Sequence, residues 1–257
     1  MIELIARHIN TLLLDFDKTI GFMKTPHLEM YCEIAIGTGL EIDADYLLSR
    51  LKATPLGDAW AEWRTSEGVI HREESKDEES YRILRASIAE KRIRAAIVEH
   101  LDGGVTEIIR EASMKIAVAE SEPNRYAIYD EVREFLIQIK SENISVALVS
   151  NHDWNLSQIT DDLGLSPYLD AVVTSARVGV RKPHQEMFLH AMRALAATPE
   201  SSLMVGDSLE DDVHGANALG IPSVLIDRSG AQDLDTGNRK IESLIDLWGE
   251  AQDECKQ

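Results

Sequence analysis

The stretch NTLLLDFDKT, residues 10–19, decides how the rest of the sequence is interpreted. Its apolar part, TLLLDF (11–16), has the length of a strand and no polar alternation, which is typical of a strand buried on both faces of a parallel sheet. Asp15 and Asp17 stand at the end of this run. Like charges that lie close together repel, and burying either carboxylate is costly unless something compensates. The pattern therefore predicts that a cation or a reaction makes use of the pair.

Four further apolar runs of strand length lie in the second half of the chain: ISVALVS (144–150), DAVVTS (170–175), LMVGD (203–207) and PSVLID (222–227). Helical patterns alternate with them, at 130–143, 155–164, 183–197 and 211–220. Such alternation is the pattern of an α/β protein, in which the helices pack on the faces of a parallel sheet. We therefore expect a three-layer open parallel sheet with a Rossmann-like arrangement and helices on both faces.

Residues 22–125 break this alternation. Helical patterns at 26–39, 43–51, 56–64, 73–101 and 105–120 predict an all-helical domain inserted after the first strand. Residues 1–21 and 126–257 would then form the core domain. Several aromatic and basic residues of the insertion could contact a substrate, although aromatic residues at near-helical spacing more often belong to a core: Trp60, Trp63, Arg64, His71 and Arg72.

The composition limits the classes of function. The chain has 257 residues, 44% of them hydrophobic and 28% charged, which indicates a globular protein. Its formal net charge of −19 disfavours nucleic-acid binding and docking on an anionic membrane. Glu3 and Arg7 interrupt the first apolar run, so we expect no signal peptide and a cytoplasmic protein. Cys32 and Cys255 are expected to be free thiols.

Polar side chains stand at the ends of the apolar runs. In an open parallel sheet, ligands bind beyond the carboxyl ends of the strands, so we expect these side chains in one cleft. They are Asp15, Asp17, Ser150, Asn151, Asp207, Asp211 and Asp212, with Lys182 supplied by the segment that follows the 170–175 run. Carboxylate oxygens suit Mg²⁺, which often shares a substrate phosphate with the protein. Beside such a cation, Asp15 could attack phosphorus while a protonated Asp17 donates to the leaving oxygen.

Four short motifs, DFDKT, VSN, RKP and GDSLEDD, occur in this order at 15–19, 149–151, 181–183 and 206–212. Together they resemble the motifs of the haloacid dehalogenase-like (HAD) hydrolase superfamily, and their flanks look most like its phosphatase branch. The helical insertion resembles the cap domain that this family carries between its first and second motifs. The resemblance implies a HAD core and a Mg²⁺-dependent phosphomonoester hydrolase that works through an aspartyl-phosphate.

The resemblance also implies roles for individual residues. Asp15 would be the nucleophile and Asp17 the general acid/base. The phosphate would be held by Ser150, Asn151 and Lys182. The metal would be bound by Asp15, the backbone carbonyl of Asp17, Asp207 and Asp212, while Asp211 stands where relatives often carry Asn.

Two positions depart from the family pattern. Lys18 gives DKT, as in ion-pumping ATPases, but those carry Thr where this chain has Asp17. His184 follows the KP of the third motif, where an acid is common, so the start of the next helix could be capped differently.

Other functions are compatible with the same residues. A phosphomutase would return the phosphoryl group to a sugar phosphate, and a catalytically silent binding module would keep the fold without turnover. A dehalogenase is disfavoured, because Asp17 and the acids of the fourth motif belong to metal-assisted phosphoryl transfer. A phosphonate-cleaving enzyme would need a lysine from the cap, for which Lys24 and Lys52 are candidates.

Further predictions concern the residues around the cleft, the substrate and the assembly. His152 and Trp154 follow the second motif and either edge the cleft or pack locally. Specificity is expected to come from the insertion as it closes over the cleft. The expected partner is a small phosphorylated metabolite, with neither nucleic acid nor membrane, and the expected assembly is a monomer or homodimer.

Overall fold

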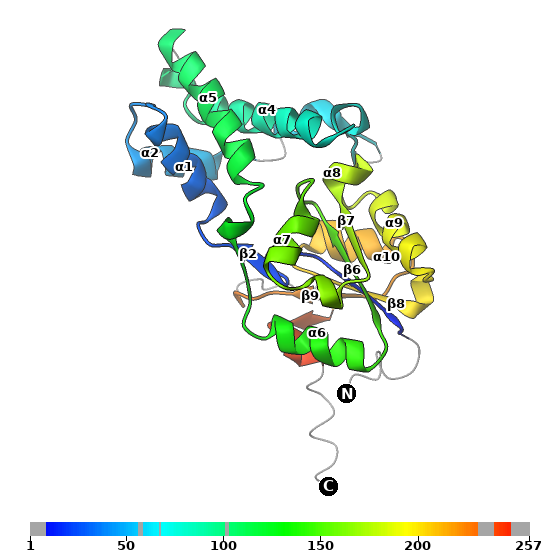
Figure 1. The fold of residues 1–257 in the computed structure, drawn as a ribbon. Coiled ribbons are helices and arrows are strands. Elements are labelled where there is room, and N and C mark those ends of the chain that lie inside the picture. Colours follow the sequence, from blue (N-terminus) through cyan, green and yellow to red (C-terminus); the bar gives the residue numbers. More distant parts are fainter. Residues whose placement is uncertain (1–8, 56–58, 67, 101–102, 231–238, 248–257) are drawn as a thin grey trace.

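The computed structural model describes residues 9–55, 59–66, 68–100, 103–230 and 239–247 (Figure 1). Its central sheet has six strands in the order β10-β9-β8-β1-β6-β7, and all of their pairings are parallel. β1 lies between β6 and β8, with Leu14 in register with Leu148 and Val205. The strands are β1 (Thr11–Leu14), β6 (Ser145–Ser150), β7 (Ala171–Thr174), β8 (Ser202–Gly206), β9 (Ser223–Ile226) and β10 (Lys240–Ile241). The predicted open parallel sheet is confirmed.

Helices flank this sheet and make the expected three layers (Figure 1). Because successive side chains of a strand point to opposite faces, β1 contributes to two apolar clusters. Leu12 and Leu14 share one cluster with Phe135, while Leu13 shares the other with Phe188. The helices are α6 (Val132–Ser141), α7 (Leu156–Asp162), α8 (Ser175–Val178), α9 (Gln185–Leu195), the π-helical turn η7 (Leu209–His214) and α10 (Gly215–Asn217). Single 3₁₀ turns lie at η4 (Pro123–Arg125), η5 (Ser166–Tyr168), η6 (Pro199–Ser201) and η8 (Leu244–Leu247).

The insertion forms a group of helices that stands apart from those flanking the sheet (Figure 1). It has its own apolar cluster, in which Tyr31, Leu47, Ile93 and Ile116 are fully buried. Its helices are α1 (His27–Gly37), α2 (Ala44–Ala53), α4 (Glu78–Ala96) and α5 (Gly103–Ala119), with short turns η1 (Ala61–Trp63), η2 (Arg72–Glu74) and η3 (Val98–His100).

The expectation of an all-helical insertion is wrong in one place. A two-stranded ladder joins β3 (Arg64–Thr65) to β4 (Gly68–Val69), and it begins at the last residue of the helix predicted at 56–64. The helix predicted from residue 73 begins instead at Glu78, because the Asp77 side chain accepts from the Ser80 main-chain N–H and caps it there. Cys255 and residues 56–58 lie outside the described residues, while Cys32 is a buried free thiol.

A short antiparallel ribbon connects the insertion to the core. It pairs β2 (Gly21–Met23) with β5 (Tyr126–Ile128), and Gly21 is in register with Ile128. The predicted boundaries, at 21/22 and 125/126, both fall at this ribbon. The division into core and cap domains stays a prediction.

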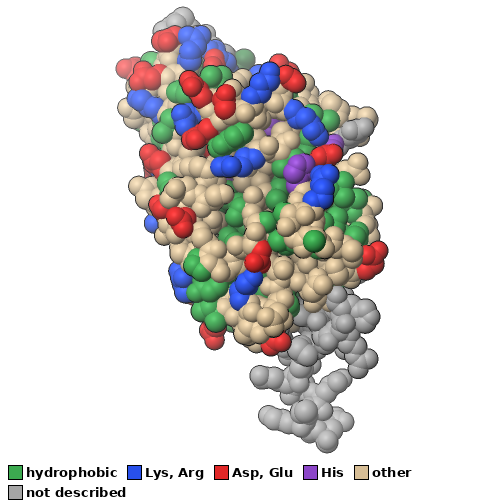
Figure 2. Space-filling model, turned by 45° about the vertical axis from the view of Figure 1, so that its right-hand side comes forward, with side chains coloured by type: hydrophobic (Ala, Val, Ile, Leu, Met, Phe, Trp, Pro, Cys, Tyr) green, Lys and Arg blue, Asp and Glu red, His purple; other side chains and the backbone are tan. Residues whose placement is uncertain are grey.

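The surface of the insertion carries charges of both signs. In the view of Figure 2, Lys and Arg side chains alternate with Asp and Glu over its helices, at the top of the molecule. None of the helices in the described ranges has the length and apolar character of a membrane span.

Candidate active site

The ends of β1, β6 and β8 bring the predicted polar residues to one edge of the sheet. Asp15 follows β1 directly, and its main-chain N–H donates to the Val205 carbonyl of β8 at 3.0 Å. Beyond Asp15 the chain turns sharply, because the N–H groups of Ile20 and Gly21 both donate to the Phe16 carbonyl, at 3.0 and 2.8 Å. Because this turn ends the extended chain at Phe16, Asp17 stays close to Asp15.

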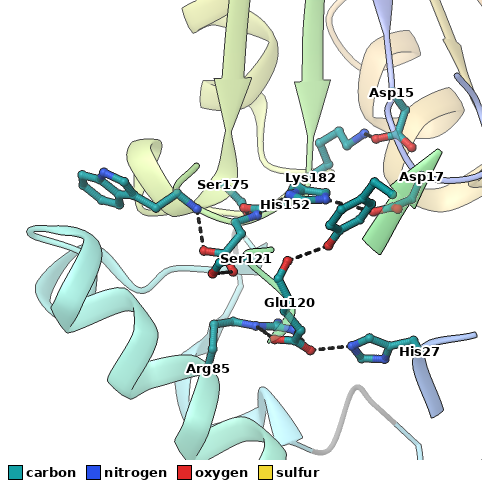
Figure 3. Close-up of polar contacts among 12 residues, drawn as sticks. Asp15, Asp17, His27, Arg85, Glu120, Ser121, His152, Ser175 and Lys182 are labelled. Atoms are coloured by element: carbon teal, nitrogen blue, oxygen red, sulfur yellow. Dashed lines mark hydrogen bonds and ion pairs between the residues drawn. The ribbon is translucent and has the colours of Figure 1, made fainter. Parts of the chain in front are cut away.

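Lys182 occupies the centre of this edge. Its ammonium nitrogen lies 2.7 Å from Oδ1 of Asp15 (Figure 3) and 2.5 Å from Oδ1 of Asp212, and the residue is only 4% exposed. Burial alone would lower the pKa of the Lys182 ammonium, but Asp15 and Asp212 outweigh it and raise the pKa above its ordinary value. Lys182 is therefore a fixed positive charge beside the candidate nucleophile.

Three carboxylates around Lys182 form a candidate metal centre. Oxygen atoms of Asp15, Asp207 and Asp212 all lie within 4.8 Å of one another. Burial and the charge of Asp15 raise the pKa of Asp207 to about 6, so the cluster carries repulsion that Lys182 does not remove. A hard divalent cation prefers this kind of oxygen donor and would relieve that repulsion. The donor set therefore fits Mg²⁺.

Gly206 and Ser208 fix the position of Asp212. A Cβ added to Gly206 would lie 2.2 Å from Cγ and Oδ2 of Asp212, so only glycine leaves room for that side chain. The main-chain N–H of Ser208 donates to Oδ2 of Asp212 at 3.0 Å. Asp212, the last acid of the motif GDSLEDD, therefore packs directly against Gly206, the first residue of the motif.

Asn151 has a role that the sequence did not suggest. Its Oδ1 accepts from the Lys182 main-chain N–H at 2.7 Å, and its Nδ2 donates to the Lys182 carbonyl at 3.1 Å. The same Nδ2 also donates to Asp211 Oδ2 at 3.2 Å. The side-chain amide therefore holds the main chain at Lys182 in place, and Asp211 helps to orient the amide. Contact of Asn151 with phosphate stays a prediction, as does that of Ser150, which is buried at the last position of β6.

Asp17 differs from the other acids in its exposure. Its side chain is 48% exposed, and its Oδ2 lies 3.8 Å from Nε2 of His152. Reduced solvation and the charge of Asp15 raise the pKa of Asp17 to about 7, although about half of the side chain still meets solvent. A carboxyl with such a pKa can hold and release a proton near neutrality, as a general acid/base must.

His184 caps the next helix in place of an acid. Its Nδ1 accepts from the main-chain N–H of Glu186 at 3.2 Å, at the N-terminus of α9. The departure from the family pattern therefore changes the chemistry of the cap without removing it.

The insertion contacts residues 179–181, which lead into Lys182, through main-chain hydrogen bonds. The His71 N–H donates to the Gly179 carbonyl at 2.8 Å, and the Arg181 N–H donates to the Val69 carbonyl at 3.1 Å. The Arg181 guanidinium lies 4.5 Å from the centre of the Trp60 ring. Trp60 is 3% exposed and belongs to an apolar cluster, so this aromatic residue is part of a core, as its near-helical spacing favoured.

Comparison with known proteins supplies the family context. Residues 9–220 match the family model described as a haloacid dehalogenase-like hydrolase. The chain is 31% identical over 134 residues to a ribulose-1,5-bisphosphate 5-phosphatase of Halopiger xanaduensis, a match that covers 49% of this chain and 56% of the relative. It is 33% identical over 130 residues to a phosphoserine phosphatase of Thermus thermophilus, covering 49% and 50%. The chain thus spans about half the length of these curated relatives.

A solved structure has the same fold. The putative HAD-hydrolase YfnB of Bacillus subtilis, bound to magnesium, superposes with a TM-score of 0.66. The match covers 94% of this chain and 98% of the other at 17% identity. The similarity therefore extends over the insertion as well as over the sheet.

Proposed function

Because the chain belongs to the haloacid dehalogenase-like hydrolase family, we propose that it is a Mg²⁺-dependent phosphatase acting on a small phosphomonoester. One observation carries the proposal: buried Lys182 lies between Asp15 and Asp212, with Asp207 beside them, at the carboxyl edge of a parallel sheet. The names of the two curated relatives, both phosphatases of small phosphorylated metabolites, support this class of substrate.

The reaction would consist of two phosphoryl transfers, first to Asp15 and then to water. A carboxylate oxygen of Asp15 forms a bond to phosphorus as the ester P–O bond breaks, which leaves an aspartyl-phosphate. Asp17 gives its proton to the departing oxygen and later takes one from the water that hydrolyses the intermediate. Lys182 and Ser150 would hold the phosphate oxygens during both transfers.

Asp15, the main-chain carbonyl of Asp17, Asp207 and Asp212 would hold Mg²⁺. When bound, the ion draws negative charge from the phosphate, so that an anionic nucleophile can approach an anionic ester. The roles of Asp211 and Asn151 in this scheme are to keep Lys182 in place, through the contacts described above.

Phosphate release from an aryl phosphate, with and without Mg²⁺, tests the proposal. We expect release by the wild type in Mg²⁺ and a loss of at least about 1,000-fold in Asp15→Asn, because the nucleophile is gone. Asp45→Asn, which changes an exposed acid on α2, is the matched control and should keep wild-type activity.

The outcomes separate the candidate functions. Equal release by Asp15→Asn and wild type would refute the proposed nucleophile. Mg²⁺ binding without turnover of aryl phosphate, phosphoserine or ribulose bisphosphate would favour a silent binding module. Conversion of a sugar phosphate to its isomer, without release of phosphate, would favour a phosphomutase.

A further inference from the structure

His152 is a buried residue beside the candidate general acid. It follows Ser150 and Asn151 directly and is 6% exposed. Its ring packs against two aromatic rings, with centroid distances of 5.3 Å to Phe16 and 5.3 Å to Tyr126, and these two rings also contact each other. This packing leaves the imidazole little freedom to rotate.

Hydrogen bonds fix which ring nitrogen carries the hydrogen. The main-chain N–H of Asp153 donates to Nδ1 of His152 at 2.7 Å. A nitrogen that accepts a hydrogen bond carries no hydrogen, so the neutral ring carries its hydrogen on Nε2. The Ser175 hydroxyl donates to the His152 carbonyl at 3.3 Å and holds the backbone as well. The Asp153 N–H and the Ser175 hydroxyl therefore fix the orientation of His152, with Nε2–H as the donor of its ring.

That donor faces Asp17. Nε2 of His152 lies 3.8 Å from Oδ2 of Asp17, on the half-exposed side chain that can still rotate towards it (Figure 3). We propose that His152 is a positioning residue, whose Nε2–H donates to Oδ2 of Asp17 and leaves Oδ1 to face the leaving group. This inference rests on the proposed role of Asp17 as general acid. Bonds between such groups are often long before substrate binds and shorten in the working complex.

The hydrogen bond has a chemical consequence. During formation of the aspartyl-phosphate, the proton on Oδ1 of Asp17 moves to the leaving oxygen as the P–O bond breaks. Asp17 becomes an anion in that step, and a donor on Oδ2 stabilises the anion. His152 itself neither gains nor loses a proton.

The site of this contact is linked to the insertion. Oδ2 of Asp153 accepts from the hydroxyl of Ser121, which follows α5 where the chain returns to the core (Figure 3). The Tyr126 hydroxyl, on the ring that packs against His152, donates to the Glu120 carbonyl at 2.6 Å. The surroundings of His152 therefore come from both the core and the returning chain.

Two esters with different leaving groups test the proposal. An alkyl oxygen needs a proton as it leaves, whereas an aryl oxygen leaves readily without one. We expect His152→Phe to lower kcat/KM for an alkyl phosphate at least about 10-fold more than for an aryl phosphate. His152→Gln can place an amide N–H near the position of Nε2–H, so it should return kcat/KM for the alkyl ester to within about 3-fold of wild type.

Two further variants exclude a merely structural effect. In the Asp17→Asn background, His152→Phe should cause no additional selective loss, because the residue acts through Asp17. Tyr126→Phe keeps the ring beside His152 and should affect both esters equally. Circular dichroism verifies that each variant is folded, and His152→Leu replaces His152→Phe if the larger ring prevents folding.

The possible results are distinct. An equal loss on both esters in His152→Phe, or no recovery in folded His152→Gln, would overturn the positioning role while leaving the proposed phosphatase intact. An absence of phosphate release by wild type from both esters would overturn the proposed function, and with it this inference.

Discussion

Replacing Glu120 by Gln is expected to lower the free energy of unfolding by about 3–5 kcal/mol. Glu120 is 4% exposed, and its carboxylate accepts from Nε and Nη2 of Arg85 at 3.0 and 2.8 Å. His27 contacts the same carboxylate, with Nε2 at 2.5 Å from Oε1 (Figure 3). Gln keeps the size of the side chain but leaves the Arg85 guanidinium, whose side chain is 14% exposed, without its counterion. The penalty is that of a buried charge whose partner has been removed.

The same pair predicts a pH dependence. Burial alone would raise the pKa of Glu120, but Arg85 and the hydrogen bond from His27 outweigh it and lower the pKa from 4.5 to about 2. Because the folded-state pKa is depressed, this stabilisation is complete above about pH 4.5 and is lost as the pH falls towards 2. At about 1.4 kcal/mol per pH unit, the loss amounts to about 3 kcal/mol.

Urea unfolding followed by circular dichroism, at pH 7 and at pH 3, measures both effects. Glu120→Gln should lose stability at pH 7 and should show a smaller loss between pH 7 and pH 3 than wild type. The matched control is Glu111→Gln, which removes an exposed i,i+4 pair with Lys115 and should change stability by no more than about 0.5 kcal/mol. A change below about 1 kcal/mol in Glu120→Gln, or a pH response equal to that of wild type, would refute the reasoning.

Three more substitutions have defined outcomes. Gly206→Ala should lower phosphate release about 100-fold by displacing Asp212, whereas Gly37→Ala, whose new Cβ meets no atom within 4 Å, should not; equal activity would contradict the packing argument. Gly179→Ala puts a Cβ 2.6 Å from Arg72 Cγ at a φ of +79°, so hydrogen exchange of the His71 amide should become faster; unchanged exchange would count against it. Lys182→Met leaves Asp15 and Asp212 without their buried ammonium, and should abolish phosphate release and lower stability by about 3–5 kcal/mol; an active variant would show that the lysine is dispensable.

The sheet could be predicted from the sequence because its strands are continuous apolar runs. The runs at 11–16, 144–150, 170–175 and 222–227 each contain an observed strand, and the run at 203–207 overlaps β8, which begins one residue earlier at Ser202. Burial on both faces leaves an unmistakable local pattern, and the parallel order then places the strand ends together. The proximity of Asp15, Lys182, Asp207 and Asp212 followed from that geometry, whereas β10, with two residues, has no such run and was not predicted.

The contacts between distant short segments could not be predicted. The β3–β4 ladder has two residues in each strand, and just beyond it Ile70 forms an isolated antiparallel bridge with Val180. Nothing in a two-residue segment distinguishes a strand from a loop, so only the tertiary packing selects the pairing. Glu120 is similar, because its sequence suggests an exposed acid at a helix end, and its burial depends on Arg85, which lies 35 residues away.

The positions of these contacts connect the insertion to the proposed chemistry. His71 and Val69 bond to the main chain at Gly179 and Arg181, and Arg181 is bonded directly to Lys182. Ser121 bonds to Asp153, which is adjacent to His152 and supplies the N–H that orients its ring. A movement of the insertion must therefore either break these bonds or displace the backbone next to two of the residues that face Asp15 and Asp17. If the insertion opens to admit substrate, the cost of opening includes these hydrogen bonds.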